Sequence, residues 1–135
     1  FAEIETAYEA DDLDLACELE TQVWFDGDGR EASQVDAAAR ARLFAMNRRA
    51  IGGGRNGERQ PDLTPSAAER LGEISVPTLI LTGALDIPYI QAAAEVMRDG
   101  ISHSVWIEYP DAAHLPNMEH PDRFNDSVGR FLQSL

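Results

Sequence analysis

Residues 76–83 read Val-Pro-Thr-Leu-Ile-Leu-Thr-Gly, a short apolar run that ends at a glycine. Near-continuous hydrophobicity over so few residues is typical of a strand that is buried on both faces of a parallel sheet. Pro77 lies near the start of the run, where a strand tolerates a missing N–H group. The segment therefore predicts a buried parallel strand over residues 76–82.

The residues that follow predict a strand–helix–strand–helix sequence. Ile90, Ala94 and Met97 mark a helix that stops at Gly100. A second strand is expected from Ser104 to Tyr109, and a last helix from about Pro121 to Leu132. Parallel strands joined by a right-handed crossover are usually neighbours, so we expect an α/β fold whose two strands end at the same edge of one sheet.

The first half of the chain predicts helices and no strand. Apolar side chains recur at helical spacing over residues 3–9, 11–25 and about 33–50, and Ser33 with Asp36 resembles a capping box at the start of the third helix. Residues 52–63 are rich in glycine and polar side chains, which predicts a loop or linker before a short helix at Thr64-Pro65.

Charge is distributed unevenly along this half. Residues 1–20 carry eight acidic side chains and no basic one, whereas residues 40–59 carry six arginines against a single glutamate. This pattern predicts two solvated helix faces that attract each other, with a charge-selective ligand site as the alternative.

Composition excludes several classes of function. The chain of 135 residues has a formal net charge of −13, and a protein that binds a nucleic-acid backbone needs a basic face. No apolar run approaches the roughly 18 residues of a membrane span. A single cysteine, Cys17, excludes an internal disulfide and a cysteine-rich zinc site. We therefore expect no nucleic acid and no membrane as a partner. No cluster of His, Asp and Glu has metal-ligand spacing and no glycine-rich loop has the context of a phosphate site, so we expect no metal or cofactor. A cytoplasmic location is also expected.

Two residues with chemical potential follow the two predicted strands. Asp86 comes shortly after Gly83, and His114 lies in the loop after Tyr109. Ligands of open α/β sheets bind at the carboxyl edge of the strands, and a carboxylate beside an imidazole can orient the ring and stabilise its protonated form. The alternatives are that Asp86 only caps the following helix and that His114 is an ordinary loop histidine.

Three segments of the second half together match the sequence pattern of a known family. They are Val76-Pro77-Thr78-Leu79-Ile80-Leu81-Thr82-Gly83-x-x-Asp86, then His114-Leu115-Pro116-Asn117-x-Glu119-x-Pro121-x-x-Phe124, and finally Phe131-Leu132. Residues 71–135 thereby resemble the C-terminal part of an α/β-hydrolase, a family whose triad runs Ser, acid, His along the chain. The resemblance implies that Asp86 is the catalytic acid and His114 the base. Ala113 departs from the family pattern, which commonly has glycine before the histidine.

Residues 1–70 are similar, less specifically, to the helical cap that many of these enzymes carry, and Trp24-Phe25-Asp26-Gly27 fits that comparison. The resemblance implies a cap segment with its linker over residues 1–70 and a partial α/β-hydrolase core over residues 71–135. Trp24, Phe25 and Leu115 are candidates for a substrate pocket, with packing inside the core or cap as the alternative for the aromatic rings. No Gly-x-Ser-x-Gly motif occurs in the chain, so the nucleophile and oxyanion hole are expected upstream.

Three functions remain open from the sequence. The first is a hydrolase of small hydrophobic esters, lactones or related carbonyl compounds, inactive as this chain alone and needing no cofactor. The second is a catalytically inactive fragment that serves as an interaction or assembly module. The third is a small flavodoxin-like binding domain, although the helical first half supplies no strand for such a sheet. An open apolar sheet edge invites pairing, so the expected partners are the N-terminal half of the fold, another subunit, or a second copy in a homodimer.

Overall fold

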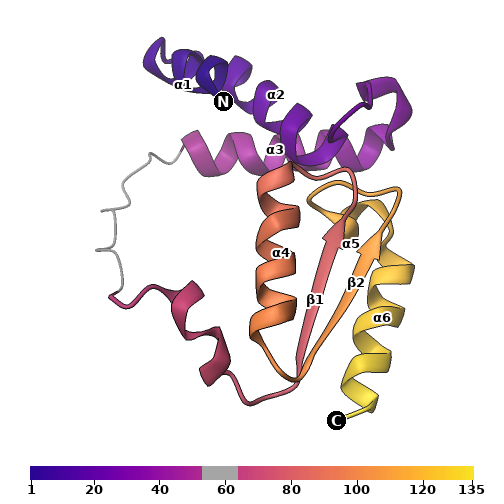
Figure 1. The fold of residues 1–135 in the computed structure, drawn as a ribbon. Helices are drawn as coiled ribbons and strands as arrows, with labels where there is room; N and C mark the ends of the chain where they lie inside the picture. Colours follow the sequence, from indigo (N-terminus) through magenta and orange to yellow (C-terminus); the bar gives the residue numbers. More distant parts are fainter. Residues whose placement is uncertain (53–63) are drawn as a thin grey trace.

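A computed structural model describes residues 1–52 and 64–135, so the loop predicted over 52–63 lies outside the described residues apart from Gly52. The chain forms a helical layer, defined as residues 1–52, and a core unit that carries the sheet (Figure 1). The layer contains α1 (Ala2–Glu9), α2 (Leu13–Thr21), the π-helical turn η1 (Gln22–Asp26), the 3-10 turn η2 (Ala32–Gln34) and α3 (Ala37–Gly52). The core unit contains η3 (Ala67–Glu73), β1 (Thr78–Gly83), α4 (Pro88–Gly100), β2 (Ser104–Tyr109), α5 (Pro116–Glu119) and α6 (Pro121–Gln133).

The two strands confirm the predicted parallel pairing. β1 and β2 are hydrogen-bonded neighbours, with a register that runs from Thr78 opposite Ser104 to Gly83 opposite Tyr109. β1 begins at Thr78 rather than at Val76, because Pro77 has no N–H to give to the ladder, whereas the Thr78 N–H donates to the His103 carbonyl at 3.0 Å.

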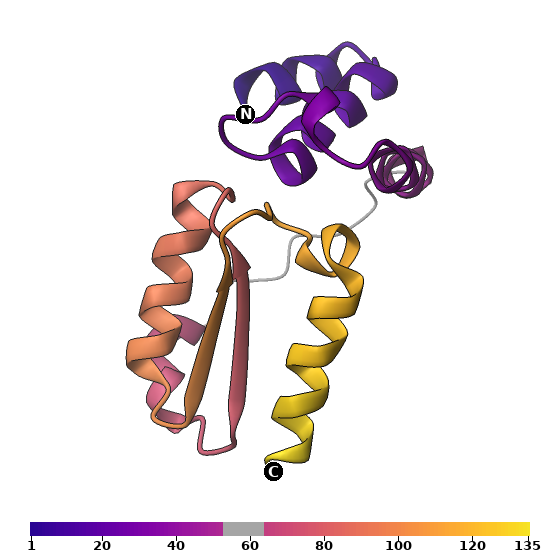
Figure 2. The ribbon, with the colours of Figure 1, turned by 90° about the vertical axis from the view of Figure 1, so that its right-hand side faces the viewer.

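Helices cover both faces of this sheet. Figure 2 shows α4 on one side of the strands and α6 on the other. Ile80 and Ala94 are buried where α4 meets the sheet, and Tyr109 is completely buried at the end of β2. The Tyr109 hydroxyl donates to Ser127 Oγ at 2.9 Å, which joins β2 to α6. These contacts give the mixed α/β architecture with a parallel sheet that the sequence predicts.

The core unit exposes apolar side chains. Within the described residues the sheet has only two strands, and Val105 on β2 is 49% exposed while Leu132 on α6 is 59% exposed. Burying a large aliphatic side chain is worth roughly 1.5–3 kcal/mol. The core unit therefore has the surface expected of part of a larger sheet.

The helical layer lies over the carboxyl ends of the strands (Figure 1). Ion pairs inside the layer confirm that its acidic and basic faces attract each other: Arg40 lies 2.7 Å from Glu18, and Arg48 lies 2.5 Å from Asp14. Cys17 is fully buried between α2 and α3, with its Sγ 3.3 Å from the Phe44 carbonyl. None of the described helices has the length and apolar character needed to cross a membrane.

Helix starts differ from the sequence predictions in two places. The prediction of a capping box at Ser33 and Asp36 is wrong. The helix α3 begins at Ala37, and the Asp36 side chain caps it by accepting from the Ala39 N–H at 2.7 Å. Extended backbone at Val35 separates η2 from α3, so the helix cannot continue back to Ser33. The short helix expected at Thr64-Pro65 begins instead at Ala67, after a Ser66 cap.

Candidate active site

The loops that follow β1 and β2 are joined by backbone hydrogen bonds. The Ala84 N–H donates to the Tyr109 carbonyl at 2.8 Å, and the Leu85 N–H donates to the Ala112 carbonyl at 2.9 Å. Asp86 directly follows Leu85 in the loop after β1, and His114 lies two residues after Ala112 in the loop after β2. The pairing of the strands is thus extended past their ends, and it carries the two predicted site residues to one place.

Glycine allows this close approach at two positions. A Cβ at Gly83 would overlap the carbonyl oxygens of Ala112 and Ala113. Gly27, at φ +75°, packs against the same loops from the helical layer, where a Cβ would come within 2.6 Å of the Leu85 carbonyl and 2.7 Å of the Ala113 Cβ. The helical layer and both loops therefore meet without room for side chains at these points.

Asp86 and His114 are in direct contact. Asp86 Oδ2 lies 2.7 Å from His114 Nδ1, and Asp86 Oδ1 accepts from the Ile87 N–H at 2.8 Å. The Asp86 side chain is 2% exposed, whereas that of His114 is 39% exposed. One carboxylate oxygen thus steadies the loop before α4, and the other holds the imidazole. With Nδ1 directed at the carboxylate, Nε2 is the ring nitrogen left to exchange a proton with a reacting group.

The backbone around His114 is held from two sides. The His114 N–H donates to the Trp24 carbonyl at 3.2 Å, and the Ala113 N–H donates to Glu119 Oε1 at 2.7 Å. The Trp24 ring also lies against the imidazole, with ring centroids 4.8 Å apart. Packing and hydrogen bonds together restrict the positions available to the imidazole.

Arg30 connects this loop to the helical layer. Its guanidinium donates to the carbonyls of Phe25 and Asp26 within the layer, at 2.8 Å and 2.6 Å, and to the Asp111 carbonyl at 3.0 Å. It also forms an ion pair with Glu119 at 2.8 Å. A charged group that is largely removed from water needs such partners, and here the partners belong to both parts of the chain.

A pocket of about 440 Å³ opens beside His114. Its apolar walls come from η1, α3 and the loop after β2: Trp24, Leu43, Met46, Ala50 and Leu115. The three α3 residues recur at helical spacing, so one face of that helix forms a wall of the pocket. A pocket with mostly apolar walls and a few polar groups is the usual form of a small-molecule site.

The polar lining of this pocket comes from Glu20, Thr21, Asn47 and His114. Glu20 Oε2 accepts from the Asn47 side-chain amide at 2.6 Å, and Glu20 Oε1 accepts from the Tyr8 hydroxyl at 2.8 Å. The carboxylate is thereby held in place at the pocket wall.

Two of the three predicted pocket residues line the pocket and the third does not. Trp24 and Leu115 line the pocket next to His114. Phe25 is fully buried and is absent from its lining. Sequence reasoning did not single out Glu20 and Asn47. A usable signal was their spacing: Glu20 precedes Trp24 by four residues, and Asn47 follows Leu43 by four, so each lies on the same helix face as an apolar pocket residue.

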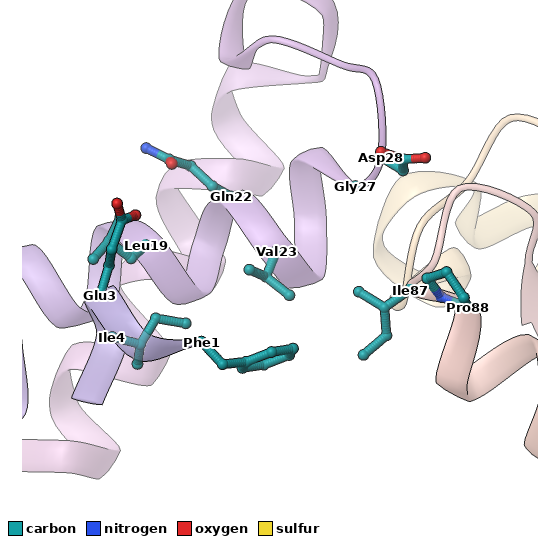
Figure 3. Close-up of a pocket in the computed structure, with 10 residues that line it drawn as sticks. All are labelled: Phe1, Glu3, Ile4, Leu19, Gln22, Val23, Gly27, Asp28, Ile87 and Pro88. Carbon is teal, nitrogen blue, oxygen red and sulfur yellow. The ribbon is translucent and has the colours of Figure 1, made fainter. Parts of the chain in front are cut away.

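A second pocket, of about 390 Å³, lies between the helical layer and the start of α4. Figure 3 shows Phe1 and Val23 on one side of it and Ile87 with Pro88 on the other. Neither Asp86 nor His114 lines this pocket, so the pocket beside His114 is the better candidate for a reaction site. Among the described residues, no three His, Cys, Asp or Glu side chains are grouped so that they could hold a metal ion.

Part of the chain is similar in sequence to known hydrolases. No family model matches it. The chain is 40% identical over 75 residues to a 2-hydroxy-6-oxononadienedioate/2-hydroxy-6-oxononatrienedioate hydrolase from Klebsiella pneumoniae subsp. pneumoniae, a match that covers 56% of this chain and 26% of that protein. It is 36% identical over 67 residues to 3-oxoadipate enol-lactonase 1 from Acinetobacter baylyi, which covers 50% of this chain and 25% of that protein.

The fold comparison extends over nearly the whole chain. The crystal structure of a bromoperoxidase from Bacillus anthracis matches with a TM-score of 0.70 at 20% identity, covering 98% of this chain and 49% of that chain. The matched segment thus spans about a quarter of the length of the curated relatives and about half of the solved structure.

Proposed function

We propose that this chain, which belongs to the α/β-hydrolase superfamily, supplies the acid, the base and part of the substrate pocket of an ester- or lactone-hydrolysing Ser-His-Asp enzyme. The observation that carries the proposal is the 2.7 Å contact between His114 Nδ1 and Asp86 Oδ2 at the carboxyl edge of the sheet. The helical layer acts as the cap over this edge.

The chemistry assigned to the two residues is acyl transfer. A serine outside these 135 residues attacks the substrate carbonyl while its hydroxyl proton passes to His114 Nε2. Asp86 stabilises the imidazolium that forms, and His114 then returns the proton to the departing alkoxide. In the second half of the reaction His114 takes a proton from water, which attacks the acyl-enzyme, and returns it to the serine oxygen as the acid is released.

The proposal requires a nucleophile and an oxyanion hole from elsewhere in the complete protein or from a partner. The chain contains no Gly-x-Ser-x-Gly motif, and the exposed apolar surface around Val105 and Leu132 is suited to packing against further strands and helices. We propose that the N-terminal half of the hydrolase fold covers this surface.

Hydrolysis of a 4-nitrophenyl ester by the complete protein tests the proposal. His114→Ala is expected to lower kcat by about a thousandfold or more. His103→Ala is the matched control, because His103 precedes β2 at the opposite end of the sheet and is exposed. Equal activity of wild type and His114→Ala would refute the assignment.

The competing function is an inactive fragment that serves as an assembly module, and the absent serine motif favours it. A module of this kind binds its partner through the exposed apolar surface, and its Asp86–His114 pair takes part in no reaction. Full hydrolytic activity that depends on His114 excludes it.

A further inference from the structure

We propose that Glu20 makes the pocket beside His114 selective for substrates with a cationic or neutral hydrogen-bond-donating group, against substrates with a carboxylate at that position. This inference rests on the proposed function, since it concerns the group that the substrate carries away from the reacting carbonyl. Glu20 would be a specificity-determining residue of the same site.

Glu20 lies close to the candidate reaction site. Glu20 and His114 line the same pocket. Glu20 lies one helical turn before Trp24, whose ring is packed against the imidazole with centroids 4.8 Å apart. A substrate whose carbonyl lies near His114 therefore directs one end along the apolar walls toward Glu20.

Glu20 brings an uncompensated negative charge to this pocket. The Glu20 carboxylate accepts hydrogen bonds from two neutral donors, the Tyr8 hydroxyl and the Asn47 amide. These donors fix the carboxylate without cancelling its charge. Among the described residues that line the pocket, none is an arginine, so the negative charge acts on whatever occupies the pocket.

Two arginines of α3 are engaged with carboxylates other than Glu20. Arg40 pairs with Glu18 and Asp26, and Arg48 pairs with Asp14. With a formal net charge of −13, the whole chain also repels anions. Two of the curated relatives are named for a dienedioate and an oxoadipate. The proposed charge preference of this pocket is opposite to the charge of the compounds in those two names.

Binding to the complete protein tests the pocket without any reaction. The probes are butyltrimethylammonium, neutral N-butylacetamide and hexanoate, followed through the Trp24 indole and His114 ring signals by NMR. Butyltrimethylammonium is expected to bind at least about tenfold more tightly than hexanoate, and Glu20→Gln is expected to reduce that ratio to about threefold or less. Asp126→Asn, which removes one negative charge from exposed α6, is the control and should keep the wild-type ratio.

Four results would overturn the inference: equal binding of cation and anion, tighter binding of hexanoate, no binding of any probe, or a wild-type binding ratio in Glu20→Gln. Glutamine preserves the shape of the side chain, and the Tyr8 hydroxyl can still donate to its carbonyl. Should Glu20→Gln fail to fold, the comparison of the three probes in wild type still decides the charge preference.

A hydrolysis series separates this inference from the proposed function. The substrates are the 4-nitrophenyl esters of 4-(trimethylammonio)butanoic acid and pentanoic acid, and the mono-4-nitrophenyl ester of glutaric acid. We expect kcat/KM to fall in that order and the order to flatten in Glu20→Gln. Hydrolysis without a charge preference refutes the role of Glu20 alone. A charge preference in binding with no hydrolysis of any ester refutes the proposed function alone.

Discussion

Arg30 and Glu119 form an ion pair at 2.8 Å that joins the helical layer to the loop carrying His114. Their side chains are 16% and 6% exposed. The other Glu119 oxygen accepts from the Ala113 N–H, directly before His114. The position of the imidazole therefore depends on a contact between the two parts of the chain.

We expect Arg30→Met to destabilise the protein by about 3 kcal/mol, because it leaves the Glu119 carboxylate buried without a counter-charge and three carbonyls without their donor. Urea unfolding measures the change. Arg70→Met is the matched control: its ion pair with Glu73 is exposed on both sides, and its loss should leave the midpoint unchanged. Similar effects of the two substitutions would show that the Arg30 contact contributes no more than a surface pair.

Gly83→Ala tests the close approach of the two loops. The added methyl group would overlap the carbonyls of Ala112 and Ala113, and the Ala112 carbonyl cannot move without breaking its hydrogen bond from the Leu85 N–H. We expect a loss of about 3 kcal/mol or more in the free energy of unfolding. Gly129→Ala in α6 meets nothing within 4 Å and should be neutral or stabilising, by up to about 1 kcal/mol. Equal tolerance at both positions would contradict the packing described for the site.

Arg40 predicts an acid-sensitive contribution to stability. Hydrogen bonding from Arg40 lowers the pKa of Glu18 below its usual value. A carboxyl with a lowered pKa in the folded state binds fewer protons there than when unfolded, so its stabilisation is present above the unfolded pKa and is lost as the pH falls through the folded pKa.

The free energy of unfolding of wild type should therefore fall more steeply than that of Arg40→Gln as the pH is lowered from about 5 to about 3. Urea unfolding at several pH values measures both slopes. Arg130→Gln is the control, since Arg130 donates to the Asp126 carbonyl rather than to a carboxylate, and it should keep the wild-type slope. Parallel curves for wild type and Arg40→Gln would exclude the assigned role of Arg40.

The sequence predicts those parts of the site that depend on local patterns. The buried run before Gly83 and the later strand ending at Tyr109 place Asp86 and His114 at one sheet edge, and the structure brings these two side chains into contact. The wall that α3 gives to the pocket was also within reach, since Leu43 and Met46 already form an apolar helix face.

Contacts between distant segments escaped sequence reasoning. Arg30 and Glu119 are remote from each other in the chain, and a single charge in a turn carries no local signal of its partner. Local pattern also fails to separate Phe25 from Trp24. The two aromatic residues are adjacent in the chain, yet Phe25 is fully buried and Trp24 lines the pocket. Only the packing of the helical layer on the two loops distinguishes them.

The most direct test of the account is the rate at which a fluorophosphonate probe labels the complete protein, because covalent labelling requires a serine activated by a neighbouring base. We predict stoichiometric labelling of one serine in wild type, unchanged labelling in His103→Ala, and a rate lowered by about a thousandfold in His114→Ala. Labelling of His114→Ala at the wild-type rate, or no labelling of the wild-type protein, would contradict the claim that Asp86 and His114 are the acid and base of a hydrolase.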